Sequence, residues 1–526
     1  MADARPEVQA RASVPRNPAT DRLAAVPLAR ADDADRPSLH VRLFGTHQFF
    51  RLWVAQVVSA FGDWLGFLGI TILAARVGAG GAAGGGAAVG VVMAARIVPG
   101  FFLAPVAGVV VDRFNRKKVM VACDLGRAAV VATLPWVDTV LGLVIASFLL
   151  EIGTLLWSPA KEATVPNLVP PERLTSANSL SLAAAYGTFP IAALMFALLA
   201  KVAQWLGGID ALRFLDTDQE ALAFYTDVVS FVTAAILIAA LPIWSPRRVA
   251  SRDGEGAAEA DEEVEPKRTV DWAQTFHEMK EGWQYIFINP VVRSVNVGLT
   301  IGLIGGGMVV PLGSVFSISV LRAGPAGFGL FITSLGFGVA AGVLILSVFQ
   351  NRVNRVRTFT IALMVAGGSM IGAASLSELG PVLALVFVLG TCAGAVYVTG
   401  FTLLHEHTDD ELRGRTFSAL YTLVRLCLLV AFAIGPFFSE LLNGLSTSLF
   451  GDRRIELFGG EIFLPGVRLT LWVAGLIVLV AGMMTGVSLR AGHLGREAAQ
   501  GTEATEATER TGASAAAEPT GSTEAD

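Results

Sequence analysis

The chain has 526 residues, of which 53% are hydrophobic and only 16% are charged, and its mean hydropathy is +0.60. Soluble domains carry about 25% charged residues, so this composition excludes a soluble globular protein and indicates a polytopic membrane protein. The net charge of −5 says little about partners because the acids gather in the tails and a linker, and nucleic acid is not an expected partner. The three cysteines have no paired spacing, which argues against a disulfide framework or a zinc site.

The first half of the chain begins with a polar tail and continues with six apolar runs. Residues 1–40 are rich in Ala, Arg, Asp and Pro without apolar periodicity, which predicts a disordered tail and no cleavable signal peptide. A membrane-spanning helix needs about 20 residues. The first bundle, over 41–245, is therefore predicted to contain spans at 48–77, 87–111, 118–137, 139–162, 174–205 and 221–244.

A polar segment over 246–289 separates the halves. It contains DGEGAAEADEEVEPKR, which predicts an acidic linker. Apolar residues then recur at helical spacing and predict an amphipathic helix on the membrane surface: Trp272, Phe276, Met279, Trp283 and Ile286. This helix either packs beneath the bundles or couples the two halves, and both interpretations stay open.

The second half repeats the pattern of the first. Further spans are predicted at 290–321, 326–350, 357–377, 381–405, 413–445 and 466–489, forming a bundle over 290–490 before a low-complexity tail at 491–526. GVVVDRFNRKK at 108–118 returns as SVFQNRVNRVR at 347–357, and VPPERLTSANSL at 169–180 returns as DDELRGRTFSAL at 409–420. Two segments that are repeated at nearly the same distance along the chain indicate a duplicated half. The chain has no phosphate-loop motif for ATP, so any transport is expected to be secondary.

The loop at 108–118 resembles the loop between the second and third spans of the major facilitator superfamily, Gly-x-x-x-Asp-Arg-x-Gly-Arg-Arg/Lys. Five positions match: Gly108, Asp112, Arg113, Arg116 and Lys117. Asn115 replaces a glycine, and because Asn readily adopts a left-handed backbone, we expect the turn to be kept. The resemblance implies an all-α polytopic membrane protein whose twelve transmembrane helices form two pseudo-symmetric six-helix bundles.

The resemblance also implies a gating role for this loop, because in the family its acid and bases form a latch between the halves. The carriers here would be Asp112, Arg113 and Arg116, with Asp124 and Arg127 on span 3 within reach. The alternative is purely topological, since Lys and Arg in short loops hold those loops in the cytoplasm. This rule predicts that both termini lie in the cytoplasm. We also expect the protein to be a monomer in the plasma membrane.

Four charged residues lie deep inside predicted spans: Asp63, Arg96, Glu151 and Arg425. A charge at the bilayer centre costs about 2.5–3.5 kcal/mol, so such residues are functional candidates. The resemblance places all four near the central cavity of the fold. Asp63 and Glu151 are candidates for carrying a coupling proton, with Arg96 as partner of one of them, and a fixed ion pair is the alternative. For Arg425, a structural tie and a substrate contact both stay open.

Glycine and proline mark places where spans approach one another or bend. The candidates for packing or hinge positions are Gly187 and Pro190 on span 5, Gly298, Gly302 and Gly306 on span 7, and Gly435 and Pro436 on span 11. Spacing by four permits close backbone contact. The Gly and Pro positions of spans 5 and 11 correspond roughly in the two halves and are similar to a degenerate form of the Gly-Pro motif of drug antiporters.

Finer resemblance points to one branch of the superfamily. FRLWVAQVVSAFGDWL at 50–65 and ELRGR at 411–415 are similar to the bacterial branch of macrolide and other drug efflux proteins and the enterobactin exporter. This implies a proton-coupled exporter of drugs or small amphipathic metabolites, with no enzymatic activity, cofactor or metal, and with substrate, protons and the lipid bilayer as partners. A narrow siderophore or lysophospholipid transporter and a non-transporting membrane scaffold are the alternatives.

Overall fold

The computed structural model describes residues 44–80, 84–242, 284, 286–349, 352–408, 410–451, 454–457 and 460–488. The predicted tails and most of the predicted linker and amphipathic helix lie outside these residues. Within them, twelve helical segments are long and apolar enough to cross a membrane, six before and six after the gap at 243–283, which confirms the predicted number of spans.

The first bundle contains α3 (His47–Ala79), α4 (Gly84–Arg113), α5 (Arg116–Thr133), α6 (Val140–Thr164), α7 (Leu174–Gly187), α8 (Phe189–Leu206), the short α9 (Phe214–Thr217) and α10 (Ala221–Ala239). The second contains α12 (Pro290–Gly307), α13 (Val309–Ser319), α14 (Gly324–Phe349), α15 (Arg355–Ser375), α16 (Leu379–Glu406), α17 (Asp410–Leu429), the π-helical η6 (Val430–Ile434), α18 (Gly435–Phe450) and a last span, Gly466–Ser488. The chain between α18 and this last span forms an unpredicted antiparallel hairpin of β1 (Arg454–Leu457) and β2 (Gly460–Phe463).

Three predicted spans are interrupted rather than continuous. Span 5 divides between α7 and α8, where Pro190 occupies the first turn of α8 and cannot supply a backbone donor to a preceding turn. Span 7 divides after Gly305–Gly307, and span 11 passes through the π-turn η6 directly before Gly435 and Pro436. The Gly and Pro positions therefore fall on a helix break in span 5 and directly after a π-turn in span 11.

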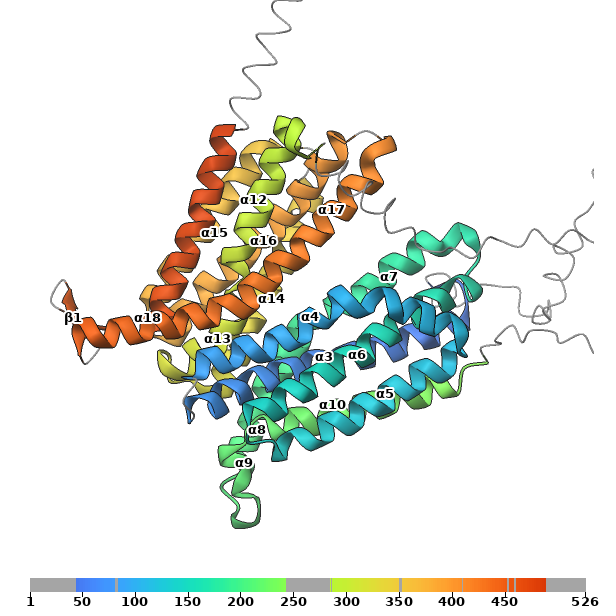
Figure 1. Cartoon of the computed structure of the whole chain (residues 1–526), viewed down its shortest axis with the longest axis horizontal. Coiled ribbons are helices and arrows are strands. Elements are labelled where there is room, and N and C mark those ends of the chain that lie inside the picture. The colour runs from blue at the N-terminus through green and yellow to red at the C-terminus, as the bar shows by residue number, and fades with distance from the viewer. Residues whose placement is uncertain are drawn as a thin grey trace, which may run out of the picture.

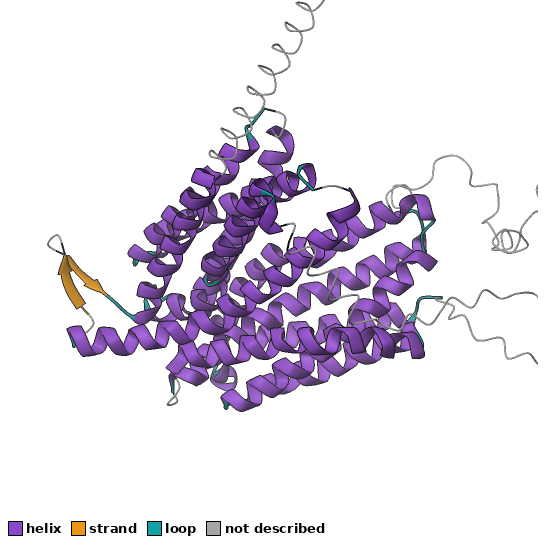
Figure 2. Ribbon diagram, turned by 45° about the horizontal axis from the view of Figure 1, so that its top comes forward, coloured by secondary structure: helices purple, strands orange, loops and turns teal. Residues whose placement is uncertain are grey.

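The two bundles pack together at one end and diverge at the other, toward α7 and α17 (Figures 1 and 2). At the closed end α8 lies against α14, and α4 lies against α18 and η6. These helices approach through glycines. A Cβ at Gly329 would lie 2.7 Å from the Ala197 amide nitrogen, and one at Gly90 would lie 2.6 Å from the Ala433 carbonyl oxygen. The closed end is thus a seam of direct backbone contact between the halves.

Candidate functional site

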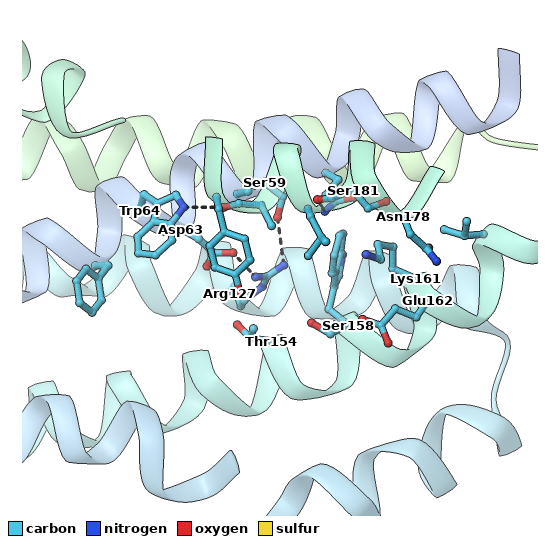
Figure 3. A pocket seen from close by; sticks show the side chains of 18 of the residues that line it. Ser59, Asp63, Trp64, Arg127, Thr154, Ser158, Lys161, Glu162, Asn178 and Ser181 are labelled. Carbon is cyan, nitrogen blue, oxygen red and sulfur yellow. Dashed lines mark hydrogen bonds and ion pairs between the residues drawn. The ribbon is translucent and has the colours of Figure 1, made fainter. Parts of the chain in front are cut away.

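A cavity of about 760 Å³ opens along the first bundle, and every residue that lines it lies between Gln56 and Tyr186. Its wall combines aromatic side chains with charges of both signs. The aromatic residues are Trp64, Phe67, Trp157 and Tyr186, and the charged ones are Asp63, Arg96, Arg127, Lys161 and Glu162. α3 is held against α7 by indole and amide donors, since Trp64 Nε1 donates to the Ala185 carbonyl at 2.9 Å and Gln56 Nε2 donates to the Ser181 carbonyl at 2.8 Å (Figure 3).

Arg127 on α5 is the centre of the polar wall. Its Nη1 contacts Asp63 Oδ2 at 2.8 Å, and its Nη2 contacts Ser59 Oγ at 3.3 Å (Figure 3). The same Nη2 contacts Asp124 Oδ1 at 2.5 Å. The guanidinium also lies 4.3 Å from the centre of the Phe231 ring. Gly153 on α6 leaves room for the side chain, because a Cβ there would lie 2.8 Å from Arg127 Cγ. The arginine is only 2% exposed, so its two carboxylate partners supply the charge that keeps it inside a membrane span.

Asp124 is held from a second side. Trp157 Nε1 on α6 donates to its Oδ2 at 3.2 Å, and Ser59 Oγ on α3 donates to its Oδ1 at 3.4 Å. Its side chain is completely buried, whereas that of Asp63 is 28% exposed. Asp63 is therefore the acid of this cluster that faces the cavity.

The structure brings the four predicted intramembrane charges into one electrostatic neighbourhood. The charged groups that interact electrostatically with Glu151 are Arg96, Asp63, Arg425 and Arg127. Arg96 lines the cavity with its guanidinium 5.5 Å from the centre of the Phe67 ring. Among the described residues, however, the ion pair of Asp63 is made by Arg127 and not by Arg96, and no ion pair within 4 Å joins Arg96 to Glu151.

Asp124 and Arg127 have partners other than those expected from the gating motif. The sequence grouped them with the loop at 108–118, but their described hydrogen bonds and ion pairs run to Asp63, Ser59 and Trp157 inside the first bundle. The physical reason is position along the helix, because Asp124 and Arg127 lie more than two turns into α5, away from the loop.

The loop itself corrects one expectation. Asn115 has φ −67° and ψ 112°, so it is not left-handed; its side chain instead caps α5 by accepting from the Lys118 amide at 3.2 Å. Arg116 donates to the Ala163 carbonyl at the end of α6, and Lys117 donates to the Leu241 carbonyl just beyond α10. Both cations thus lie at helix C-termini of their own half. Arg113 is exposed, and the side chain of Asp112 is outside the described structure.

The second half repeats this arrangement. Asn354 caps α15 by accepting from the Arg357 amide at 3.0 Å, as Asn115 caps α5. Arg355 then forms an ion pair with Glu406 at the end of α16, where Arg116 reaches the end of α6. The weaker sequence repeat at 347–357 therefore keeps the N-cap and the basic contact but lacks the acid of the loop at 108–118.

The glycine positions differ in what surrounds them. A Cβ at Gly298 would lie 2.5 Å from Thr485 Oγ1, one at Gly302 would lie 2.9 Å from Leu363 Cδ2, and one at Gly435 would lie 2.8 Å from Met308 Cγ, so these three are sites of close packing. Gly187 and Gly306 would meet nothing within 4 Å, and close packing does not explain them.

The sequence interpretation missed Asp227 on α10. This residue is 1% exposed, and its carboxyl group lies against Gly62 and Gly66 of α3. The same rule that selected Asp63 could have found it, since Asp227 is an acid inside the predicted span 221–244. Lys161 and Glu162, which line the cavity near the end of α6, were also not selected.

Comparison with known proteins places these features in a family. The model of the Major Facilitator Superfamily matches residues 52–431. The chain is 25% identical over 354 residues to macrolide efflux protein A of Streptococcus pyogenes, an alignment that covers 64% of this chain and 76% of that protein. It is 26% identical over 442 residues to an uncharacterised MFS-type transporter of Mycobacterium tuberculosis, covering 80% of this chain and 89% of that one.

Solved structures share the fold at low sequence identity. A bacterial homologue of the human lysosomal transporter Spinster, in an inward-facing and unoccupied conformation, superposes with a TM-score of 0.60 at 14% identity, covering 85% of this chain and 98% of that chain. A D-xylose–proton symporter superposes with a TM-score of 0.56 at 14% identity, covering 82% of this chain and 96% of that one.

Proposed function

The chain belongs to the major facilitator superfamily, and from this premise we propose that it is a proton-coupled exporter of drugs or small amphipathic metabolites. The observation that carries the proposal is the composition of the cavity wall. Trp64, Phe67 and Tyr186 offer flat apolar surfaces, and Asp63 and Arg96 offer opposite charges a short distance along the same wall. A site of this kind suits a molecule with an apolar body and a polar group, since few fixed polar contacts orient a mainly apolar ligand.

The direction of the opening supports alternating access. The basic loops at Arg116 and Arg355 lie at the diverging ends of the bundles, and basic loops favour the cytoplasm. On this assignment the structure is the inward-open state, in which substrate enters the cavity from the cytoplasm or the inner leaflet. Closing that end and parting the α8–α14 seam would then release the substrate outside.

The driving force is sufficient for useful export. One proton that enters through a potential of about 100 mV releases about 2.3 kcal/mol, which supports roughly a fifty-fold gradient of a neutral substrate. The macrolide efflux protein of S. pyogenes makes macrolides the first substrates to try.

The test is efflux from intact cells. Cells that express the chain are loaded with a panel of fluorescent amphiphiles and with a macrolide, and efflux is followed with and without a protonophore. We expect efflux above the empty-vector control, loss of that efflux with the protonophore, and a fall of about tenfold in Asp63→Asn or Glu151→Gln, as for loss of a group that must carry charge or protons in the cycle. Asp138→Asn, in the exposed loop before α6, is the matched control.

Two results would contradict the proposal. Efflux that persists with the protonophore would show that transport is not coupled to protons. Efflux equal to the empty-vector control for every compound, at normal expression, would remove drug export and favour a dedicated siderophore or lysophospholipid transporter or a scaffold.

A further inference from the structure

Asp227 occupies a notch that α3 leaves open for its carboxyl group. Gly62 and Gly66 are one helical turn apart on the face of α3 that meets α10, and a Cβ at Gly66 would lie 3.4 Å from Asp227 Cγ and closer still to its Oδ2. Ser230 Oγ, one turn along α10, donates to the Asp227 backbone carbonyl at 2.8 Å and lies 3.3 Å from Asp227 Oδ1. The carboxyl group therefore lies against the α3 backbone at these glycines and near one hydroxyl group, and 1% of the residue's surface is exposed.

No cation pairs with Asp227 among the described residues. The charged groups that act on it are Asp63 on α3, Arg127 on α5 and Arg96 on α4. Arg127 is already occupied, because one amino nitrogen contacts Asp63 and the other contacts Asp124. α8, which also packs against α10, carries a single charged residue, Lys201, whose ammonium group donates to Gln204. Asp227 therefore has no ion-pair partner on any helix packed against it.

The balance of charges around Arg127 limits the protonation state of the nearby acids. Arg127 pairs with both Asp63 and Asp124, so full ionisation would leave Asp227 as a buried carboxylate without an ion-pair partner among the described residues. Burying an unpaired carboxylate is far more costly than burying the neutral acid. Asp124 is fixed by Arg127, Trp157 and Ser59, whereas Asp227 has no cation partner among the described residues and Asp63, next to Gly62 on α3, faces the cavity.

We infer that Asp227 and Asp63 share the exchangeable proton that couples transport, with Asp227 as its buried holder and Asp63 as its contact with the cavity. The inference rests on the proposed function. A proton from water on one side of the membrane binds one of the two carboxylates, and it leaves to water on the other side after the cavity has changed its access; Arg127 stays charged throughout. The helices that carry the pair are α3, which lines the cavity, and α10, which does not.

The test separates driven transport from exchange. Purified protein in liposomes is given the fluorescent amphiphile that the cell assay identifies, either with a pH gradient or with equal pH and unlabelled compound on the other side. For Asp227→Asn we expect gradient-driven accumulation to fall about tenfold, a loss of about 1.4 kcal/mol, while exchange stays within about twofold of the unmodified protein. Asp138→Asn should keep both activities. Equal loss of both activities, or loss of neither, would show that Asp227 does not carry the coupling proton.

A second measurement needs no substrate. The infrared C=O stretching band of a protonated carboxylic acid, which shifts in heavy water, should be present in the unmodified protein and in Asp138→Asn at neutral pH and should lose intensity in Asp227→Asn. An unchanged band would overturn the inference even if no amphiphile is transported, and in that case the failure of the proposed function would be seen separately. Should Asp227→Asn not fold, Asp63→Asn should lower gradient-driven accumulation about tenfold, and unchanged accumulation in that variant would overturn the inference. Accumulation driven by a sodium gradient in place of a pH gradient would also contradict a proton site.

Discussion

At the scale of single residues, Glu220 shows how burial alone makes a group sensitive to pH. It precedes α10 with 1% of its surface exposed, and its Oε1 lies 2.8 Å from Arg76 Nη2 at the end of α3. Asp218 pairs with the same arginine. Burial raises the pKa of Glu220 from 4.5 to about 7, and the nearby Arg76 only partly opposes this rise.

The sign of the effect on stability follows from proton binding. Between pH 4.5 and about 7 the unfolded chain has lost this proton and the folded protein keeps it, so the free energy of unfolding falls as pH rises through that range. In the unmodified protein this fall in the free energy of unfolding should be on the order of a few kcal/mol, and in Glu220→Gln we expect it to be absent. The measurement is thermal unfolding in detergent from pH 4.5 to 7.5, with Asp138→Asn as control. A pH profile identical in the Glu220→Gln and unmodified proteins would contradict this prediction.

The residue scale also shows what a sequence can and cannot locate. Asp63 was predictable because its depth in an apolar run is visible in the sequence, and Asp227 could have been found in the same way. The partner of Asp63 was not predictable, since Arg127 is 64 residues away and its position around the axis of α5 depends on how three helices pack. Depth follows from counting residues, whereas pairing follows from helix rotation.

At the scale of elements, the spans were predictable from hydropathy, but their interruptions were not. An apolar run has the same composition whether one continuous helix or two helical segments form the span. The predicted span at 174–205 is confirmed as one crossing, but its composition does not indicate that α7 ends at Gly187 and α8 begins at Phe189. Asn115 was misread for a related reason. The family pattern suggested a glycine-like turn, whereas in the structure the side chain makes an N-cap.

The two caps give a prediction about the duplicated halves. Asn115→Ala and Asn354→Ala each remove a side-chain acceptor for the first turn of α5 or α15. We expect each to lower the free energy of unfolding by about 1 kcal/mol, as for other N-caps, and to do so by similar amounts. Chemical unfolding in mixed detergent measures this, with Asn178→Ala inside α7 as a comparison that removes no cap. A loss in only one variant would show that the two loops are not structurally equivalent.

At the scale of the whole molecule, the duplication and the two-bundle fold were predictable, and the state of the molecule was not. Which end is closed depends on contacts between halves, such as Gly329 against Ala197 and Gly336 against Pro190, and these residues are far apart in the sequence. Small residues on one helix face indicate that something packs there, but they do not say which helix it is.

Added bulk at this seam should shift the equilibrium away from the form that is closed there. Gly329→Ala would put a methyl group 2.7 Å from the Ala197 amide nitrogen, whereas Gly368→Ala on α15 adds the same methyl group with nothing within 4 Å. Overpacking costs about 1–3 kcal/mol, so the ratio of the form closed at this seam to the form open there should fall about fivefold or more. The readout is labelling of Ser158→Cys in the cavity, in a background without the three native cysteines, by a membrane-impermeant thiol reagent from the cytoplasmic side. Equal labelling in the two alanine variants would contradict the assigned role of the seam.

The ion pair of Asp124 with Arg127 has a consequence for the insertion of the protein into the membrane. The two residues are three positions apart on α5, so they can neutralise each other as soon as that helix forms, before any neighbour is present. The part of α5 beyond its basic N-terminus can then leave the ribosome and enter the lipid as a nearly neutral unit, although it contains these two charged groups. Asp63 has no such local partner within α3 and obtains Arg127 only after α5 has followed it into the bilayer. Biogenesis of the first half therefore has a natural order, in which α3 is retained near the insertion machinery until α5 arrives.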